Sequence, residues 1–375
     1  MKKINVLVLM QEPCPTIIKL IQGIKLLSDN RCNVVTISES VDFSSLWKKL
    51  GYDTALDSSV YHKKIGYLEK TLKYIFLHSA AWRKTLLEIE HNKNIDVIQT
   101  ITPDYIPVLA KKYLKKPVFH HFREIQSIFP HYLLYPGFKR VFVPVKKYFL
   151  KKLEIHAIHS SDVVSCDSQM SLQVINTMAP GNKKKLVLKN APLSQMLPES
   201  RKLKVSAQTH EKTIVYHGHI NEGALDFIRQ LCNRGLQLHI YPLVKNDKIK
   251  NELTQMKQNV FFHLHKSIEG YTNFIYELSQ YDYGLIPPSY QYEKEIFFNT
   301  YLPCKIFDFM AAGLTILAGN YSQIKTFIEE QKAGFIINNP DDVLHILQKS
   351  YNSTVSPITI DDDIRTLISL YKQYI

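Results

Sequence analysis

The sequence predicts an α/β protein built from two facing Rossmann-like domains and ending in a C-terminal helix. A length of 375 residues suits two domains of ordinary size. Short β-rich runs alternate along the chain with longer segments of helical spacing, and this pattern implies parallel sheets with crossover helices. A polar stretch near the middle of the chain, 191–212, separates two halves that share the pattern.

The first domain is expected over residues 1–190 and opens with a buried strand. The apolar run Ile4–Met10 follows two lysines, as in a secretory signal, but it is short and stops at a Gln-Glu-Pro sequence. Apolar residues at helical spacing follow over Thr16–Ser28. Four further strands are expected at Asn33–Ile37, Ile95–Thr100, Pro117–His121 and Ser161–Ser165.

The stretch 191–212 holds prolines, serines and charges without a sustained apolar period, which predicts a linker. The second domain is expected over 213–355, with helices such as Leu225–Asn233 and Tyr271–Gln280 between its strands. These strands are expected at Ile214–His217, Leu236–Tyr241, Val260–His263, Tyr283–Ile286, Thr315–Ala318 and Gly334–Ile337.

The final segment, 356–375, is expected to be helical over Ile364–Ile375 and could pack back on the N-terminal domain. Three acids, Asp361–Asp363, precede this helix and are typical of a helix start rather than a metal site. No zinc-protease helix or phosphate loop occurs, and no obvious Asp-x-Asp metal motif is present besides these three acids, so we expect no bound metal.

The composition points to a cytoplasmic protein with anionic partners. A net charge of +13 favours nucleotide phosphates, nucleic acid or an anionic membrane, although a basic surface without a specific partner has the same composition. Nucleic acid is not expected, because no recognised binding motif is present. No run approaches the roughly 20 apolar residues of a membrane span. Reduced, metal-free thiols are expected at the five scattered cysteines, Cys14, Cys32, Cys166, Cys232 and Cys304.

The most informative stretch runs from Leu302 to Ala318, LPCKIFDFMAAGLTILA. It predicts a loop that delivers Lys305 and Asp308 into a short helix ending at Gly313, followed by a strand. A helix N-terminus and a lysine together attract phosphate, and a carboxylate can accept hydrogen bonds from sugar or ribose hydroxyls. The alternative is an ordinary helix with a glycine C-cap.

This stretch resembles the donor-site signature of GT-B type retaining glycosyltransferases of the group 1, or family 4, class. The matching residues are Pro303, Lys305, Asp308, Phe309, Met310, Ala311 and Gly313. Other segments resemble the same family in the same order, namely Phe122–Ile125, Ser160–Ser165, Leu186–Pro192, Ile214–Ile220 and Tyr281–Pro287. Together the similar segments cover about residues 115–345.

The resemblance implies transfer of a hexose-like sugar from a nucleoside-diphosphate sugar to an acceptor hydroxyl, with retention and without a metal or other cofactor. It places the donor on Gly218, His219 and Lys305, with the two side chains on the diphosphate. Asp308 would contact the ribose or the donor sugar, and Thr300 could hydrogen-bond the sugar.

The sequence also departs from the family pattern. Thr300 and Asp308 stand where many members have two glutamates, and His219 stands where they have an arginine. The segment Asn221–Gly223 offers no lysine, and the loop Gln11–Thr16 lacks a glycine-rich turn. Two alternatives therefore stay open: a non-catalytic GT-B partner subunit of an active transferase, and a sugar-nucleotide epimerase.

Polar residues gather at the carboxyl end of one strand of the first domain, where His120, His121, Arg123 and Glu124 occur together. His121 could hold a donor-sugar hydroxyl and Glu124 could orient the acceptor hydroxyl. A salt-bridged loop with solvated histidines is the alternative.

The stretch Tyr105–Leu153 contains eleven Lys and Arg residues but a single acid, Glu124. Within it, residues 138–152 interleave cations with aromatic side chains, which is typical of an anionic membrane surface site. A solvated helix face is the alternative. With the resemblance, this stretch suggests a lipid-linked or surface-polysaccharide acceptor and a peripheral location on the inner face of the cell membrane.

Overall fold

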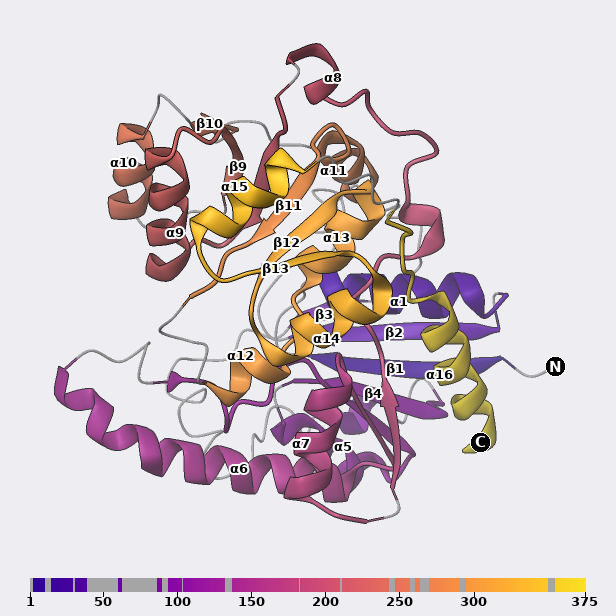
Figure 1. The fold of residues 1–375 in the computed structure, drawn as a ribbon. Coiled ribbons are helices and arrows are strands. Elements are labelled where there is room, and N and C mark those ends of the chain that lie inside the picture. Colours follow the sequence, from indigo (N-terminus) through magenta and orange to yellow (C-terminus); the bar gives the residue numbers. More distant parts are fainter. Residues whose placement is uncertain are drawn as a thin grey trace. The chain divides into compact units, whose positions relative to one another are not determined.

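The structure is a computed structural model of the 375-residue chain. It describes residues 3–10, 15–29, 31–38, 60–62, 86–89, 94–102, 104–131, 137–181, 183–209, 211–242, 247–256, 260–263, 270–289, 295–349 and 355–375. The chain forms two compact units (Figure 1). The first comprises Met1–Lys189 together with Ile360–Ile375, and the second comprises Asn190–Thr359.

The first unit contains a seven-stranded sheet whose strands follow the order β3-β2-β1-β4-β5-β6-β7. Every neighbouring pair is parallel. The strands are β1 (Ile4–Met10), β2 (Cys32–Ser38), β3 (Val60–His62), β4 (Val97–Ile101), β5 (Val118–Phe122), β6 (Val163–Cys166) and β7 (Lys184–Val187). The inner strands are buried almost throughout, as expected where helices cover both faces of a sheet, and β4 and β5 each carry two buried polar residues, Gln99 with Thr100 and His120 with His121.

Crossover helices connect the parallel strands of the first unit. Within the described residues they are α1 (Pro15–Leu27), α5 (Tyr105–Leu114), α6 (Val143–Ser160, preceded by the 3₁₀ helix η2, Gly137–Phe142) and α7 (Gln169–Met178). Helix α5 packs on α6, and one apolar core joins these helices to β1, β4 and β5.

The last helix, α16 (Asp361–Gln373), returns to the first unit and lies beside α1 (Figure 1). The Tyr371 hydroxyl donates to Gln99 Oε1 on β4 over 2.8 Å, and its ring meets Phe119 of β5 edge-on. An ion pair joins Asp363 at the start of α16 to Lys189 over 2.9 Å. These long-range contacts fix the C-terminal helix on the sheet.

The second unit contains a six-stranded parallel sheet of order β10-β9-β8-β11-β12-β13. Its strands are β8 (Ile214–Gly218), β9 (Leu238–Pro242), β10 (Val260–Phe262), β11 (Tyr283–Ile286), β12 (Thr315–Gly319) and β13 (Gly334–Ile337). Its helices include α9 (Glu222–Asn233), α10 (Asp247–Gln255), α11 (Tyr271–Leu278), α12 (Ile296–Thr300), α13 (Cys304–Ala312), α14 (Ser322–Gln331) and α15 (Pro340–Gln348). The predicted α/β class with two parallel, Rossmann-like sheets is confirmed.

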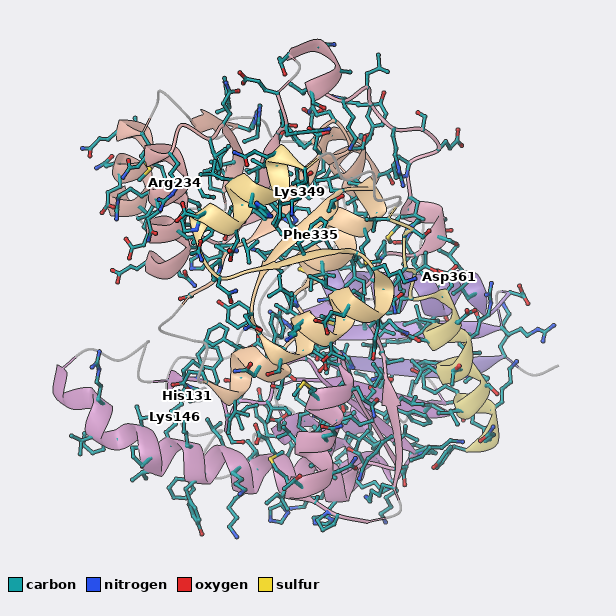
Figure 2. The ribbon with its side chains drawn as sticks, viewed as in Figure 1. His131, Lys146, Arg234, Phe335, Lys349 and Asp361 are labelled. Atoms are coloured by element: carbon teal, nitrogen blue, oxygen red, sulfur yellow. The ribbon has the colours of Figure 1, made fainter. Side chains whose placement is uncertain are left out.

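Helix α13 lies close against the sheet because β11 has a glycine beneath it. A Cβ placed on Gly284 would come within 2.3 Å of the Phe309 ring. Elsewhere in the unit, Arg234, which follows α9 and is labelled in Figure 2, donates from Nε to Asp341 Oδ1 of α15 over 2.8 Å.

The polar stretch after residue 190 packs on the second unit. Its backbone donates from Val205 to Gln280 over 2.9 Å, and the Ser206 hydroxyl, in the short helix α8 (Ser206–Thr209), donates to Asp282 over 2.8 Å. The polar residues of this stretch therefore hydrogen-bond to the folded surface of the second unit. A solvated linker would have the same composition, so the sequence alone could not distinguish the two.

Two strands fall outside the predicted set. Strand β3 has three residues, and β7 carries Lys184 and Lys185, which suit the edge of a sheet but weaken the apolar pattern.

Among the described cysteines, Cys32, Cys166, Cys232 and Cys304 are free thiols. Within the described part of the chain, no helix has the length and apolar character needed to cross a membrane.

Candidate functional site

In the second unit, a lysine lies at the carboxyl end of β8. Gly218, the last residue of that strand, has φ +100°, a conformation that favours glycine. A Cβ at Gly218 would lie 3.7 Å from the Lys305 Nζ atom. The same ammonium group lies 4.4 Å from the centre of the Tyr216 ring, which is a favourable cation–π distance. The structure thus brings together two residues that are 87 positions apart in the predicted donor set.

Lys305 also belongs to the first turn of α13, whose N-cap is Pro303. Helix N-termini carry partial positive charge and unpaired N–H groups. Parallel α/β sheets bind ligands beyond the carboxyl ends of their strands, where Gly218 lies. An ammonium group, a helix start and a glycine turn at one place form a site suited to a phosphate.

Asp308 is held by protein groups one turn further along α13. Its carboxylate is buried and accepts a hydrogen bond from the Tyr271 hydroxyl, and His217 Nε2 lies 3.6 Å from its other oxygen. The His217 ring packs edge-on against Phe274 and Phe309. The carboxylate therefore ties β8, α11 and α13 together directly behind the Gly218 turn.

His217 and Tyr271 were missed by sequence reasoning. The available signal was a histidine inside the otherwise apolar strand Ile214–Gly218, because such a residue needs a polar partner when it is buried. Tyr271 offered no comparable signal.

The other two predicted donor residues differ in exposure. His219 is exposed, and its carbonyl accepts the hydrogen bond of the Tyr216 hydroxyl, which fixes the turn after Gly218. Thr300 is buried at the end of α12, where its hydroxyl donates to the Phe297 carbonyl over 3.1 Å. Neighbouring Asn299 accepts hydrogen bonds from Ser322 at the start of α14.

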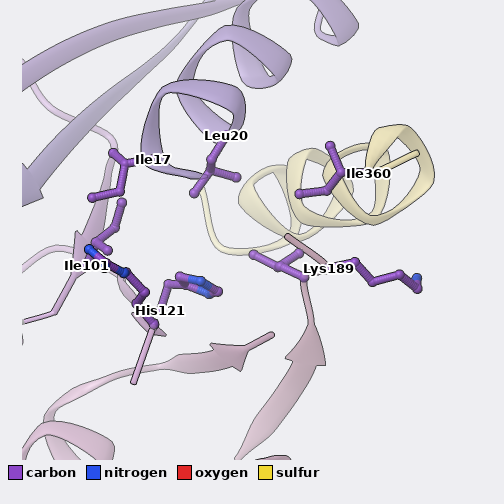
Figure 3. A pocket seen from close by; sticks show the side chains of 8 residues that line it. Ile17, Leu20, Ile101, His121, Lys189 and Ile360 are labelled. Carbon is purple, nitrogen blue, oxygen red and sulfur yellow. The ribbon is translucent and has the colours of Figure 1, made fainter. Parts of the chain in front are cut away.

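In the first unit, His121 is a buried residue of β5 that lines a pocket (Figure 3). The pocket is lined by Ile17, Leu20, Ile101, His121, Arg123, Leu188, Lys189 and Ile360. His121 Nδ1 lies 3.1 Å from the Ser165 hydroxyl of β6. Burial, with smaller effects of His120 and Arg123, lowers the pKa of His121 to about 3. The imidazole is therefore neutral near pH 7 and can hold a hydroxyl without carrying charge.

The alternative for this cluster, a salt-bridged loop with solvated histidines, is wrong about the histidines. His120 and His121 are both buried, because they lie within β5 and β5 is an inner strand of the sheet. The salt bridge of that reading is present, with Arg123 Nη2 3.6 Å from Glu124 Oε1. The residues Gln11–Cys14 of the predicted N-terminal loop lie outside the described residues.

Glu124 has an acidic neighbour that sequence reasoning missed. Asp167 follows β6, and burial raises the pKa of its carboxyl to about 7, with the charge of Glu124 acting in the same direction. Glu124 also accepts a hydrogen bond from Gln126 over 3.0 Å. The carboxyl ends of β5 and β6 thus present a neutral imidazole, one guanidinium and two carboxyls.

The opposite side of β5 holds a second polar chain that is closed to solvent. His120 Nδ1 lies 2.8 Å from the Thr100 hydroxyl, and His120 Nε2 lies 3.1 Å from Asp104. Burial lowers the pKa of His120 to about 3. Nearby, buried Glu154 of α6 accepts hydrogen bonds from both the backbone and the hydroxyl of Ser127. This chain holds the segment after β5 on α6.

The buried carboxyls of this chain predict an alkaline loss of stability. Burial raises the pKa of Glu154 and of Asp104, and the two carboxyls repel each other when both ionise. A carboxyl with a raised folded-state pKa favours the folded state at low pH, and this contribution is lost as the pH rises through that value. We expect the unfolding free energy of the first unit to fall as the pH rises from about 6.5, above the range in which unfolded histidines titrate, to about 8, the folded-state pKa of Glu154.

Glu154→Gln should reduce this slope by about 1.4 kcal/mol per pH unit, the linkage of one proton. Urea titrations at several pH values measure it, and Glu88→Gln, at an exposed residue of the first unit, is the control. Equal slopes for wild type and Glu154→Gln would contradict the prediction.

The end of η2 and helix α6 expose apolar and basic side chains, while other residues of α6 are buried. Phe142 and Tyr148 are 62% and 59% exposed, while Leu150, Leu153 and Ala157 pack inward. The exposed apolar face consists of Val141, Phe142, Val145, Tyr148 and Phe149, and Arg140, Lys146, Lys147, Lys151 and Lys152 surround it. Figure 2 labels Lys146 on this helix. The side chains of Phe138 and Lys139, at the start of the predicted patch, lie outside the described residues.

No protein-family model matches the sequence, and no curated protein matches it. Solved structures do match over nearly the whole chain. Sucrose-phosphate synthase from Thermosynechococcus elongatus has a TM-score of 0.72 at 10% identity, covering 99% of both chains. HepE from Anabaena, solved in complex with UDP, has a TM-score of 0.66 at 13% identity, covering 99% of this chain and 100% of that one.

UDP-GlcNAc 2-epimerase from Methanocaldococcus jannaschii also matches, with a TM-score of 0.57 at 12% identity, covering 98% of this chain and 100% of that one. At these identities the likeness shows the fold. The chain has the GT-B fold, with two Rossmann-like units and a C-terminal helix that returns to the first.

Proposed function

We propose that the protein is a glycosyltransferase that moves a hexose-like sugar from a nucleoside-diphosphate sugar to an acceptor hydroxyl, with retention. The observation that carries the proposal is the position of Lys305, which lies beside Gly218 at the carboxyl end of β8 and starts α13. Two proteins of the same fold support it: sucrose-phosphate synthase, and HepE, whose structure was solved with UDP.

The donor diphosphate would bind Lys305 and the start of α13, and the exposed His219 would add an imidazole hydrogen-bond donor. Charge develops on the diphosphate as the glycosidic bond breaks, and preorganised positive groups stabilise that transition state. Asp308 would contact the ribose or the donor sugar beside the Gly218 turn, which it supports together with His217. Thr300 would hydrogen-bond the sugar. No metal or other cofactor is part of this proposal.

The acceptor would bind to the first unit. Neutral His121 would accept or donate a hydrogen bond to a sugar hydroxyl in the pocket that it lines. Glu124 would orient the acceptor hydroxyl, helped by the charge of its partner Arg123. Because a retaining transfer of this type needs no dedicated protein nucleophile, these roles are positional.

The test is a screen of UDP- and GDP-sugars against lipid extracts of cell membranes, with products identified by mass spectrometry. We expect one sugar to be transferred with release of the nucleoside diphosphate, and NMR of the product should give the donor's anomeric configuration. Transfer from none of the donors would contradict the proposal, and an inverted product would contradict retention alone.

An epimerase is the second candidate, favoured by the match to UDP-GlcNAc 2-epimerase. Incubation of UDP-GlcNAc without an acceptor separates the two activities, because an epimerase forms a new UDP-sugar while a transferase does not. A non-catalytic partner subunit is the third, favoured by the engagement of Thr300 and Asp308 with protein groups. Saturating UDP or GDP would then leave the melting temperature unchanged, whereas ligand at 100 times its Kd adds about 2.7 kcal/mol of stability.

We infer further that the acceptor is lipid-linked or part of a surface polysaccharide, and that α6 lies on an anionic membrane. The exposed apolar face of η2 and α6 would enter the headgroup boundary while its flanking lysines meet anionic lipids. The opposite face of α6 packs in the core of the first unit, so the exposed apolar side is the one that can contact a lipid bilayer.

Removing two lysines of α6 should weaken membrane binding. Each cation near an anionic surface contributes about 1 kcal/mol, so Lys151→Ala with Lys152→Ala is expected to lower partitioning by about 30-fold. Flotation with phosphatidylserine-containing and pure phosphatidylcholine vesicles measures the effect. The control pair, Lys325→Ala with Lys332→Ala, removes two exposed cations of the second unit. Failure of wild type to bind either vesicle would remove the membrane proposal.

A further inference from the structure

A second helix start lies at the carboxyl end of β8. Helix α9 begins at Glu222, only three residues after His219, and spans twelve residues. Asn221 caps it by accepting a hydrogen bond from the Ala224 N–H over 2.8 Å. The Glu222 carboxylate in this first turn is exposed and so can turn to solvent. The turn therefore offers the positive end of a regular helix at the edge of the sheet.

A buried hydroxyl points into this first turn. Ser289, which follows β11 after two prolines, is 5% exposed, and its Oγ atom has no hydrogen-bond partner in the described structure. A Cβ on Gly223 would lie 2.2 Å from that oxygen and 3.0 Å from the Ser289 Cβ. The Ser289 oxygen thus lies closer to this site than the Ser289 Cβ does, and a side chain at position 223 would require the hydroxyl to turn away.

Burying a hydroxyl without a partner costs free energy. The cost is recovered when a ligand supplies an acceptor, and an anion at a helix N-terminus is the acceptor that the surroundings favour. The turn from Gly218 to Gly223 has the Lys305 ammonium group beside its first residue and the Ser289 hydroxyl beside its last.

We propose that the Ser289 hydroxyl and the first turn of α9 bind one phosphoryl group of the donor diphosphate, while Lys305 binds the other. The assignment rests on the proposed function and deepens it, since it names a phosphate ligand that is neither charged nor on α13. A hydroxyl and backbone N–H groups would hold the phosphoryl oxygens by charge-assisted hydrogen bonds. These uncharged donors would act where this chain has histidine at position 219 and no lysine in Asn221–Gly223.

The experiment measures binding of UDP, GDP and inorganic pyrophosphate to the full chain by calorimetry. Ser289→Ala removes the oxygen and keeps the Cβ, and it should weaken the binding of pyrophosphate and of the preferred nucleotide about tenfold, as expected for one hydrogen bond to a charged group. Ser206→Ala is the matched control, because it removes a hydroxyl that binds Asp282 elsewhere in the second unit.

The melting temperature of the ligand-free variants provides an independent readout. Ser289→Ala should melt at the same temperature as wild type or higher, because the variant loses an unpaired buried hydroxyl, whereas Ser206→Ala should melt lower. A second variant, Gly223→Ala, places a methyl group against the Ser289 oxygen and should also weaken pyrophosphate binding.

The outcomes separate the two proposals. If Ser289→Ala binds pyrophosphate and nucleotide as wild type does, or if it melts lower without ligand, the assignment of Ser289 is overturned and the glycosyltransferase proposal stands. If wild type binds none of the three compounds, both proposals fall together.

Discussion

Replacing Lys305 by methionine is expected to lower kcat/KM for the nucleotide sugar by about 10²- to 10³-fold, the loss typical of one preorganised group that stabilises transition-state charge. Methionine keeps an apolar chain of similar length over the Tyr216 ring, so packing at the carboxyl end of β8 should survive. The loss should appear mainly in kcat, because the diphosphate gains charge as the sugar departs. Initial rates at several donor concentrations measure both constants.

The matched control is Lys325→Met, at an exposed lysine of α14 whose Nζ atom lies 4.0 Å from Glu329 Oε1. It should keep wild-type rates. If Lys305→Met retains more than a third of the wild-type kcat/KM, then the ammonium group does not serve the leaving diphosphate, and the proposed donor site is wrong.

Replacing Tyr371 by alanine is expected to lower the unfolding free energy of the first unit by about 3–5 kcal/mol, as for other large buried aromatic residues. The side chain is fully buried, meets the Phe119 ring at 4.8 Å and donates to Gln99. Tyr371→Phe should lose about 1–3 kcal/mol, because it leaves the buried Gln99 oxygen without its donor.

The measurement is hydrogen exchange in increasing urea, followed on peptides of β4 and β5 so that it reports the first unit. Tyr374→Ala is the control on the same chain segment, since that ring also meets Phe119 but is 37% exposed. An equal loss for Tyr371→Ala and Tyr374→Ala would show that α16 contributes through general coverage and not through the buried tyrosine.

The regular elements were predictable where a local pattern decides them. Ile4–Met10 and Tyr283–Ile286 are strands at the predicted residues, because a continuous apolar run bounded by polar residues has one stable use in a sheet buried on both faces. The predicted helix before Gly313 is also present and ends at that residue in the left-handed conformation. The edge strands β3 and β7 were not predicted, because edge positions are short and tolerate lysine.

The site was predictable in part. A lysine at the start of a short helix marked Lys305 as a phosphate candidate, and the glycine after an apolar strand marked Gly218. The partners of Asp308 were not predictable, because Tyr271 and His217 come from two other elements. The surroundings of His121 were likewise not predictable, because the residues that line its pocket include Ile17 and Leu20 of α1 and Ile360 at the start of α16.

The sequence by itself determined the α/β class, the two halves and most strand positions, since periodicity and glycine placement act over neighbouring residues. Only the tertiary structure decided which polar groups meet: Lys305 beside Gly218, Asp308 with His217 and Tyr271, and Ser289 against the first turn of α9. The physical reason is that parallel strands gather their carboxyl ends at one edge of a sheet, so residues that are distant in the chain become neighbours there. A pattern among neighbouring residues in the sequence cannot predict which distant residues meet there.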